Sequence, residues 1–377
     1  MNKYKKGKVR HVHAANFFMI KYIFFSSENT TIRQYFGKRE EKTMLKGKQS
    51  ILFDEPPYII SSGSVVGKKE GEGPLGQLFD LVEEENLFGK DSWEEAESEM
   101  QKEACLMALG KAKLDPHEVR YLFGGDLLRQ GIATSMGLEE LHIPLFGLYG
   151  ACSTSGEALA LSSMSVAAGY GEYILAVTSS HFGSAEKEFR FPLAYANQRP
   201  PSSQWTVTGS GAFLVGRQKA NVRIAGVTVG KIVDYGLKDS QNMGACMAPA
   251  ACDTIIQNLS DFGYKASDYD RIITGDLGYV GQSILFDLMR KQGKDIKENH
   301  MDCGMLIFDQ QTQGTNAGGS GCGCAAVTLS SFILPKISSG EWKRVLFVPT
   351  GALMSTVSFN EGQSVPGIAH GIVLEHC

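Results

Sequence analysis

The chain has 377 residues, of which 43% are hydrophobic and 21% charged, and its formal net charge is −4. This composition is typical of a soluble globular protein, and the length suits two fused halves of about 150 residues or more. No apolar run reaches the length of a membrane-spanning helix, so we expect no span of the membrane. The acidic body of the chain is a poor candidate for general nucleic-acid binding, so we do not expect that function. The eight cysteines include no C-x-x-C pair, which favours a reducing, cytoplasmic-type compartment over a disulfide framework.

Residues 1–43 differ from the rest of the chain. They hold ten Lys/Arg and three Asp/Glu, a net charge of +7, and they interleave these charges with aromatic residues. A basic, aromatic segment can lie on an anionic membrane surface. The alternative, which we favour, is that Met44 is the true start and that residues 1–43 are a mis-called extension. The run LKGKQSILF after Met44 is a suitable beginning for a folded domain.

Buried strands and helices alternate through the first half, residues 44–218. From its pattern we expect, in order, a strand from Ile51, a Gly-rich loop over 61–76, an amphipathic helix from 91, a strand over 121–123 that ends at Asp126, a helix after Cys152, a strand over 173–177, a polar loop over 182–205 and a strand over 208–215. This alternation predicts mostly parallel sheets covered by helices.

The turn Gly150-Ala151-Cys152-Ser153 is the most informative stretch of the first half. It follows an apolar run and opens a helix rich in Ala, Ser and Leu, whose small side chains suit the middle of a core. A helix N-terminus favours negative charge, so Cys152 is a candidate nucleophile or member of an anion site. A buried structural cysteine is the alternative.

The second half, residues 219–377, repeats the order of the first. A strand that ends at Gly275-Asp276 echoes the strand that ends at Gly125-Asp126, and Gly321-Cys322-Gly323 echoes the turn at Cys152. The segments 344–351 and 369–374 echo the strand before His181 and the segment 209–215. Four features that recur in one order predict two duplicated α/β halves.

A duplicated half with a Gly-Ala-Cys-Ser turn opening a buried helix resembles the thiolase fold, which includes thiolases and beta-ketoacyl synthases. The resemblance covers about residues 45–377 and implies a five-layered α-β-α-β-α fold, a homodimer and a nucleophile position at Cys152.

More specific runs resemble the stage V sporulation protein AD family within that fold. They are GPLGQLFD, SWEEAE, GACSTS, TSSHF, EFRFP, TVTGSGA, MAPAACDTI, TGDLG, DCGMLI, GGSGCGC and IAHG. The resemblance implies a sporulation protein that binds dipicolinic acid and supports its uptake into the developing spore. It also implies membrane proteins of the same operon as partners, and peripheral association with the spore inner membrane.

The chain departs from condensing enzymes at the residues that would activate the thiol. Where initiating beta-ketoacyl synthases carry His-x-x-Asn, this chain has Gly275-Asp276-Leu277-Gly278, and the second partner position falls at Gly318-Gly319. Loss of a general base removes a factor of about 10² to 10⁴ in rate. We therefore interpret the chain as a thiolase-fold enzyme repurposed for ligand binding. An active Cys-dependent acyltransferase or ketoacyl synthase, and a scaffold for membrane partners, remain alternatives.

Dipicolinate is a planar ring with two carboxylates, so its site needs donors or a cation beside a flat slot. If the ligand arrives as its calcium chelate, Asp126 and Asp276 could contact the ion. Each of these candidates has a structural alternative. Asp126 and Asp276 could cap the segments that follow their strands, and His181 and His370 could be hydrogen-bonded core residues. Arg190 could form an ion pair at a dimer interface or on the surface. We expect no cofactor and no metal site, because Cys322 and Cys324 lack further ligands. The candidate ligand-binding residues are Cys152, His181, Arg190, Asp126, Asp276 and His370.

Overall fold

Two sheets with the same strand order form the centre of residues 44–377. The computed structural model describes residues 44–189 and 199–377, so the extension 1–43 and Arg190 lie outside the described residues. The first sheet runs β6-β5-β7-β9-β3 and the second runs β12-β11-β14-β17-β10. The first-sheet strands are β3 (Tyr58–Gly67), β5 (Tyr121–Gly125), β6 (Leu145–Leu148), β7 (Tyr173–Ser180) and β9 (Gly209–Gly216). Their counterparts are β10 (Val222–Thr228), β11 (Arg271–Thr274), β12 (His300–Asp302), β14 (Arg344–Val348) and β17 (Gly371–His376).

Strand directions repeat as well as strand order. In the first sheet β6, β5 and β7 are parallel, while β9 is antiparallel to both β7 and β3. In the second sheet β12, β11 and β14 are parallel, and β17 is antiparallel to both β14 and β10. The predicted duplication is thereby confirmed at the level of topology. A single residue pair, Arg223 with Tyr58, joins the two sheets where β10 meets β3.

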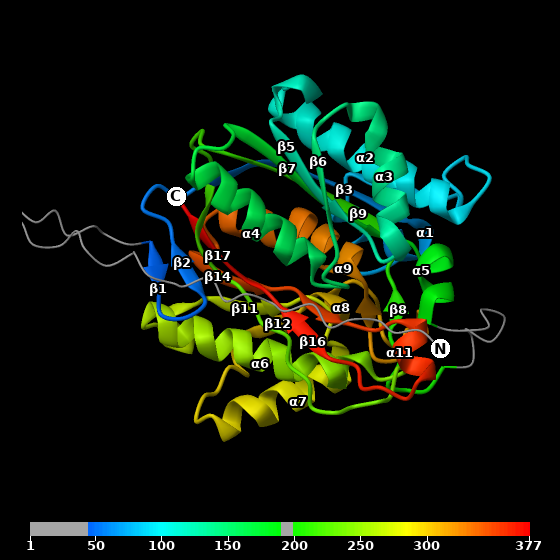
Figure 1. Ribbon diagram of the computed structural model, residues 1–377, viewed down its shortest axis with the longest axis vertical. Helices are drawn as coiled ribbons and strands as arrows, with labels where there is room; N and C mark the ends of the chain where they lie inside the picture. Colours follow the sequence, from blue (N-terminus) through cyan, green and yellow to red (C-terminus); the bar gives the residue numbers. More distant parts are fainter. Residues whose placement is uncertain (1–43, 190–198) are drawn as a thin grey trace, which may run out of the picture. The chain divides into compact units, whose positions relative to one another are not determined.

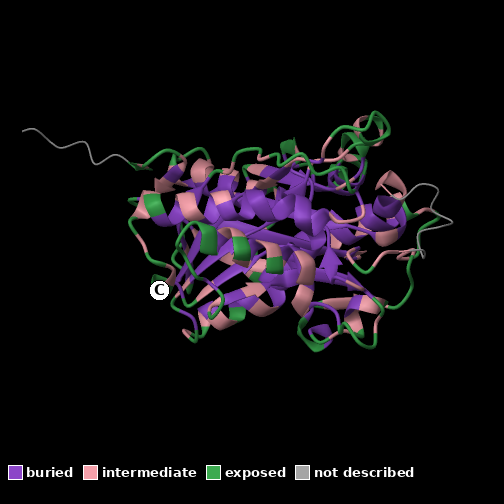
Figure 2. Ribbon diagram, turned by 90° about the horizontal axis from the view of Figure 1, so that it is seen from below, coloured by how far each residue is buried: buried purple, intermediate pink, exposed green. Residues whose placement is uncertain are grey.

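Helices form three layers around these sheets (Figure 1). The outer face of the first sheet carries α2 (Trp93–Ala112) and α3 (Ile132–Leu138), and the outer face of the second carries α6 (Met243–Phe262) and α7 (Gly278–Lys291). Between the sheets lie α4 (Thr154–Ala167) and α9 (Cys322–Thr328). The five-layered α-β-α-β-α arrangement is the predicted one. Figure 2 shows the buried residues concentrated through the centre of these layers.

Short elements complete the fold. They are β1 (Leu45–Lys46), β2 (Ser50–Leu52), α1 (Lys68–Gly71), β4 (Leu81–Glu83), α5 (Phe182–Phe189), β8 (Trp205–Thr206), α8 (Cys303–Leu306), β13 (Gly319–Ser320), α10 (Leu334–Ser338), β15 (Thr350–Ala352), α11 (Thr356–Asn360) and β16 (Gly367–Ala369). Within the described residues, no helix combines the length and apolar content that crossing a membrane requires.

Strand β3 corrects the prediction of a Gly-rich loop over 61–76. Its segment Ser61-Ser62-Gly63-Ser64 pairs with β9 in the middle of the sheet. A Cβ atom at Gly63 would lie 2.3 Å from the carbonyl oxygen of Ala104 on α2, so the small residues admit the helix and do not form a turn. The polar loop expected over 182–205 likewise begins with a helix, α5.

Candidate functional site

Cys152 lies in a tight turn between β6 and α4. Ala151, the residue before it, has a φ of 50°, which is unfavourable for a residue with a Cβ atom. The turn is held by the amides of Ser153 and Thr154, which donate to the carbonyl oxygens of Gly150 and Ala151. Cys152 itself is only 6% exposed. Two of the N–H groups that the sequence suggested for anion binding are therefore occupied within the turn.

Asp276, which follows β11, is brought to Cys152 by the packing of the second half on the first. Its Oδ2 atom accepts hydrogen bonds from the Ser320 hydroxyl (2.9 Å) and the Gly321 amide (3.0 Å), and its Oδ1 atom accepts one from the Thr350 hydroxyl (2.7 Å). The Sγ atom of Cys152 lies 3.8 Å from Ser320 Oγ, and the same hydroxyl donates to Asp276, so the Asp276 carboxyl acts on the thiol electrostatically. The structure thus unites two of the predicted residues in one buried cluster.

This cluster favours the neutral thiol of Cys152. Burial raises the pKa of Cys152 well above its ordinary value, and the negative charge of Asp276 raises that pKa further. Burial also raises the pKa of Asp276, while the hydrogen bonds from Thr350, Gly321 and Ser320 oppose that rise. Among the residues that the structure describes, the titratable group that acts on Cys152 is therefore a carboxyl group and not the imidazole that activates a catalytic cysteine.

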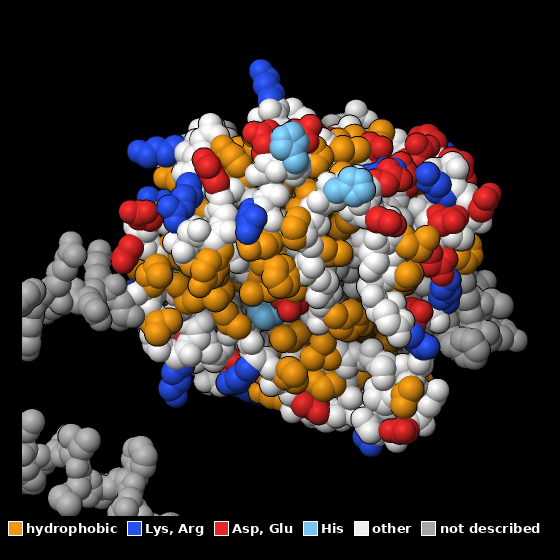
Figure 3. All heavy atoms as spheres, turned by 45° about the horizontal axis from the view of Figure 1, so that its top comes forward, with side chains coloured by type: hydrophobic (Ala, Val, Ile, Leu, Met, Phe, Trp, Pro, Cys, Tyr) orange, Lys and Arg blue, Asp and Glu red, His pale blue; other side chains and the backbone are white. Residues whose placement is uncertain are grey.

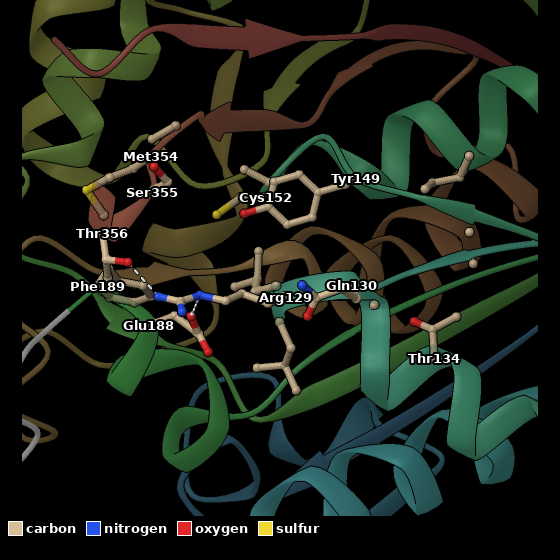
Figure 4. Close-up of a pocket in the computed structure, with 18 of the residues that line it drawn as sticks. Arg129, Gln130, Thr134, Tyr149, Cys152, Glu188, Phe189, Met354, Ser355 and Thr356 are labelled. Carbon is tan, nitrogen blue, oxygen red and sulfur yellow. Dashed lines mark hydrogen bonds and ion pairs between the residues drawn. The ribbon is translucent and has the colours of Figure 1, made fainter. Parts of the chain in front are cut away.

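A cavity of about 480 Å³ opens beside Cys152 (Figure 4). Its wall is built by the loop after β5, the end of β6, the last turn of α5 and the segment from β15 into α11. The lining consists of residues 127–131, 134–135, 147–149, 151–152, 188–189 and 354–356 together with Gly124, Met243 and Ala352. Tyr149 is 52% exposed but presents its ring to this cavity near Cys152. Partial burial of its hydroxyl and the acidic groups nearby raise the pKa of the phenol, so it stays a neutral hydroxyl.

Arg129 is the one Lys, Arg or His among the described residues that line the cavity. Its Nε atom pairs with Glu188 Oε2 at 2.8 Å, and its Nη2 atom donates to Thr356 Oγ1 at 2.5 Å. The side chain therefore spans from α5 to α11, as Figure 4 shows. Sequence analysis missed Arg129. Its place three residues after the predicted strand end at Asp126, on the edge that carries Cys152, is the signal that could have found it.

Asp126 lies behind the cavity wall and is fully buried. Its carboxyl group accepts from the Leu128 amide (2.7 Å), the Thr134 amide (2.8 Å) and the Thr134 hydroxyl (2.6 Å). These bonds hold the loop that carries Arg129, which is the capping role considered as an alternative for Asp126. Burial raises the pKa of Asp126.

The two predicted histidines lie outside the lining of the cavity. The His181 ring contacts the Asn86 carbonyl oxygen through Nε2 (2.9 Å) and accepts from the Gly183 amide through Nδ1 (3.0 Å). His370 accepts from the Gly230 amide at 3.2 Å, and burial lowers its pKa to about 4. Burial lowers the pKa of His181 as well, so both rings are neutral at pH 7. Neither histidine is placed as a base for Cys152.

Several solved structures share this architecture. The structure superposes on 3-oxoacyl-[acyl-carrier-protein] synthase III from Aquifex aeolicus VF5 with a TM-score of 0.52 and 14% identity, covering 85% of this chain and 100% of that one. It superposes on the tetronic acid condensing enzyme AbyA1 with a TM-score of 0.54 and 15% identity, covering 85% of this chain and 99% of that one. For a single-residue variant of OleA from Xanthomonas campestris the TM-score is 0.55 and the identity 13%, with coverage of 85% and 97%. At such identities the likeness shows the fold alone.

At the level of sequence, the chain is similar to one family within this fold. Residues 47–375 match the family described as stage V sporulation protein AD (SpoVAD). Stage V sporulation protein AD of Bacillus subtilis (strain 168) is 42% identical over 331 residues, which is 88% of this chain and 98% of that relative. The chain belongs to the stage V sporulation protein AD family, built on a thiolase-like fold.

Proposed function

We propose that the cavity beside Cys152 binds dipicolinic acid, alone or as its calcium chelate, and that the protein supports uptake of this acid into the developing spore. Membership of a sporulation family gives the cellular context, and the proposal adds a ligand and a binding site to it. The observation that carries it is Arg129, a guanidinium at a cavity that also offers the rings of Tyr149 and Phe189. A planar aromatic dicarboxylate matches both features, since a guanidinium binds a carboxylate through two parallel hydrogen bonds.

The surroundings of Cys152 support binding more than acyl transfer. A condensing enzyme needs a thiolate and a donor pair for the oxyanion. Here the thiol faces Asp276, and neither His181 nor His370 lies in the cavity lining. In the proposed site Cys152 and Tyr149 act as neutral groups that border the ligand, while Arg129 supplies the charge.

The decisive experiment is calorimetric titration of the full chain with dipicolinate, with and without Ca²⁺. We expect saturable binding that weakens about tenfold or more in Arg129→Gln, because the ligand loses its charge-assisted contact. Arg290→Gln is the matched control, since Arg290 pairs with Asp287 on the exposed surface of α7. Isophthalate, which keeps both carboxylates but lacks the ring nitrogen, tests recognition of the pyridine.

Absence of both heat and a thermal shift with either form of the ligand would reject the binding proposal. Mass spectrometry after incubation with acyl-CoA would then test the acyltransferase alternative, which requires an adduct on Cys152. Normal affinity in Arg129→Gln would reject the assigned site while leaving the ligand in place.

Uptake also requires a route across a membrane, and we propose that membrane proteins of the same operon supply it while this protein associates peripherally with the spore inner membrane. The test is the dipicolinate content of spores that carry Arg129→Gln. A reduced content with normal protein level supports a binding role. A normal content would favour the scaffold alternative, in which only the docking surface matters.

A further inference from the structure

The carboxylate beside Cys152 is fixed in place from several sides. Asp276 accepts hydrogen bonds from Ser320, Gly321 and Thr350, and it is only 1% exposed. Three donors directed at one carboxyl group oppose the rise in its pKa that burial causes. The donors come from β13, the start of α9 and β15, so Asp276 cannot turn away from Cys152 without breaking contacts with three elements.

We propose that Asp276 holds Cys152 as a neutral thiol, so that the thiol donates a hydrogen bond and is excluded from nucleophilic chemistry. A Cys152 thiolate would put a second negative charge into one buried cluster, beside a Ser320 hydroxyl that already donates to Asp276. The proposal concerns the thiol itself and holds whichever ligand the cavity binds.

The other ionisable groups around Cys152 do not offset this effect. Tyr149 and Cys322 both interact with Cys152, and each is neutral at pH 7 because burial raises its pKa. Arg129 lines the same cavity, but its guanidinium is engaged with Glu188 and Thr356. Asp276 is therefore the group whose replacement should change the behaviour of the thiol most.

The test is the pH dependence of Cys152 alkylation by iodoacetamide in the full chain. In this reaction the thiolate sulfur displaces iodide from the reagent and the thiol proton passes to water, so the rate follows the thiolate fraction. Cys377, the exposed cysteine of the described residues, is replaced by Ser, and peptide mapping assigns the label. Cys152→Ser gives the background. The midpoint of the pH–rate curve reports ionisation independently of how easily the reagent enters.

We expect the midpoint for Cys152 to lie above the usual thiol value of about 8.5, and to fall by about one pH unit or more in Asp276→Asn. Asp276→Ser provides a second variant if Asn disturbs folding. Glu70→Gln is the matched control, because Glu70 is another buried carboxyl group, held by the Thr208 amide, that lies outside the cluster of Cys152, Ser320 and Asp276. Its midpoint should equal that of the unsubstituted protein.

Two results would overturn the proposal. One is a midpoint at or below about 8.5 with Asp276 present, which would show a thiol of ordinary acidity. The other is an unchanged midpoint in the folded Asp276 variants, which would assign the inertness of Cys152 to burial alone. Neither result depends on dipicolinate binding, so this proposal and the proposed function can fail separately.

Discussion

At the scale of single residues, Arg129 and Glu188 form an ion pair that a ligand must rearrange. Glu188 occupies the guanidinium that an anionic ligand would bind, and its own charge repels a carboxylate. Glu188→Gln should therefore bind metal-free dipicolinate about two- to fivefold more tightly, which is the range expected from breaking a partly exposed ion pair. The calorimetric titration described above measures this. Weaker binding in Glu188→Gln would show that the carboxylate assists the ligand.

At the scale of elements, one buried acid joins α2, β7 and α5, and α5 lines the cavity. Glu97 on α2 accepts from Ser179 at the end of β7 (2.7 Å) and from Ser184 on α5 (2.6 Å). Asp126, which holds the loop of Arg129, acts on Glu97 electrostatically. Burial, reinforced by Asp126, raises the pKa of Glu97 to about 8.

This pKa makes stability fall as the pH rises. The value of about 8 in the folded state lies above the ordinary value of 4.5, so protonation of Glu97 favours folding. Its stabilising effect is complete below 4.5 and is lost as the pH rises through 8. Between about pH 6 and about pH 9, Glu97→Gln should lose less free energy of unfolding than the unsubstituted protein, by more than about 1 kcal/mol. Urea unfolding at the two pH values measures the difference, and parallel losses would contradict this account.

Glu70 provides the control for that experiment. It is also fully buried, and burial raises its pKa to about 8, but it contacts Thr208 and does not hold the cavity walls. Glu70→Gln should reduce the pH dependence of the free energy of unfolding without changing ligand affinity. Glu97→Gln should change both the pH dependence of that free energy and the ligand affinity.

At the scale of the whole molecule, β6 is the edge of the first sheet among the strands of residues 44–189 and 199–377. It pairs with β5 on one side, and its Leu145 and Phe146 are 40% and 52% exposed. Figure 3 shows hydrophobic side chains gathered across the middle of one face, with charged side chains toward its margins. Glu157 nearby has a buried Oε2 atom without a hydrogen-bond partner in the part of the chain that is described. We propose that a second copy covers this edge, since an apolar unpaired strand is a template for pairing with its own kind.

Leu145→Lys tests this homodimer, because it places a charge in the proposed interface and leaves the stacking of Phe146 on Phe123 untouched. Light scattering should give a dimer mass for the unsubstituted chain and a monomer mass for the variant. Tyr170→Lys is the control at another exposed position, 68% accessible. A monomer before any substitution, or a dimer in Leu145→Lys, would refute the arrangement.

The sequence predicted the features that repeat or that are local. The recurrence of Gly-Asp after a strand and of a small-residue helix after a turn was enough for the duplicated layers and for the positions of Cys152 and Asp276. The contact between these two residues joins the halves, so the repeat could suggest it but not show it. The direction of His181 was beyond prediction, because its ring is fixed by Asn86, 95 residues away. Arg129 was missed because its importance depends on α5 and α11 meeting around it.

The packing of α9 on the first sheet limits which substitutions the protein can accept near the cavity. A Cβ atom at Gly323 would lie 2.3 Å from the carbonyl oxygen of Gly209, so helix and strand touch backbone to backbone. A side chain at position 323 would therefore force α9 and β9 apart. The segments 127–131 and 354–356 line the cavity and lie outside this backbone contact. We expect substitutions in these two segments to change ligand specificity without disturbing the packing of α9 on the first sheet.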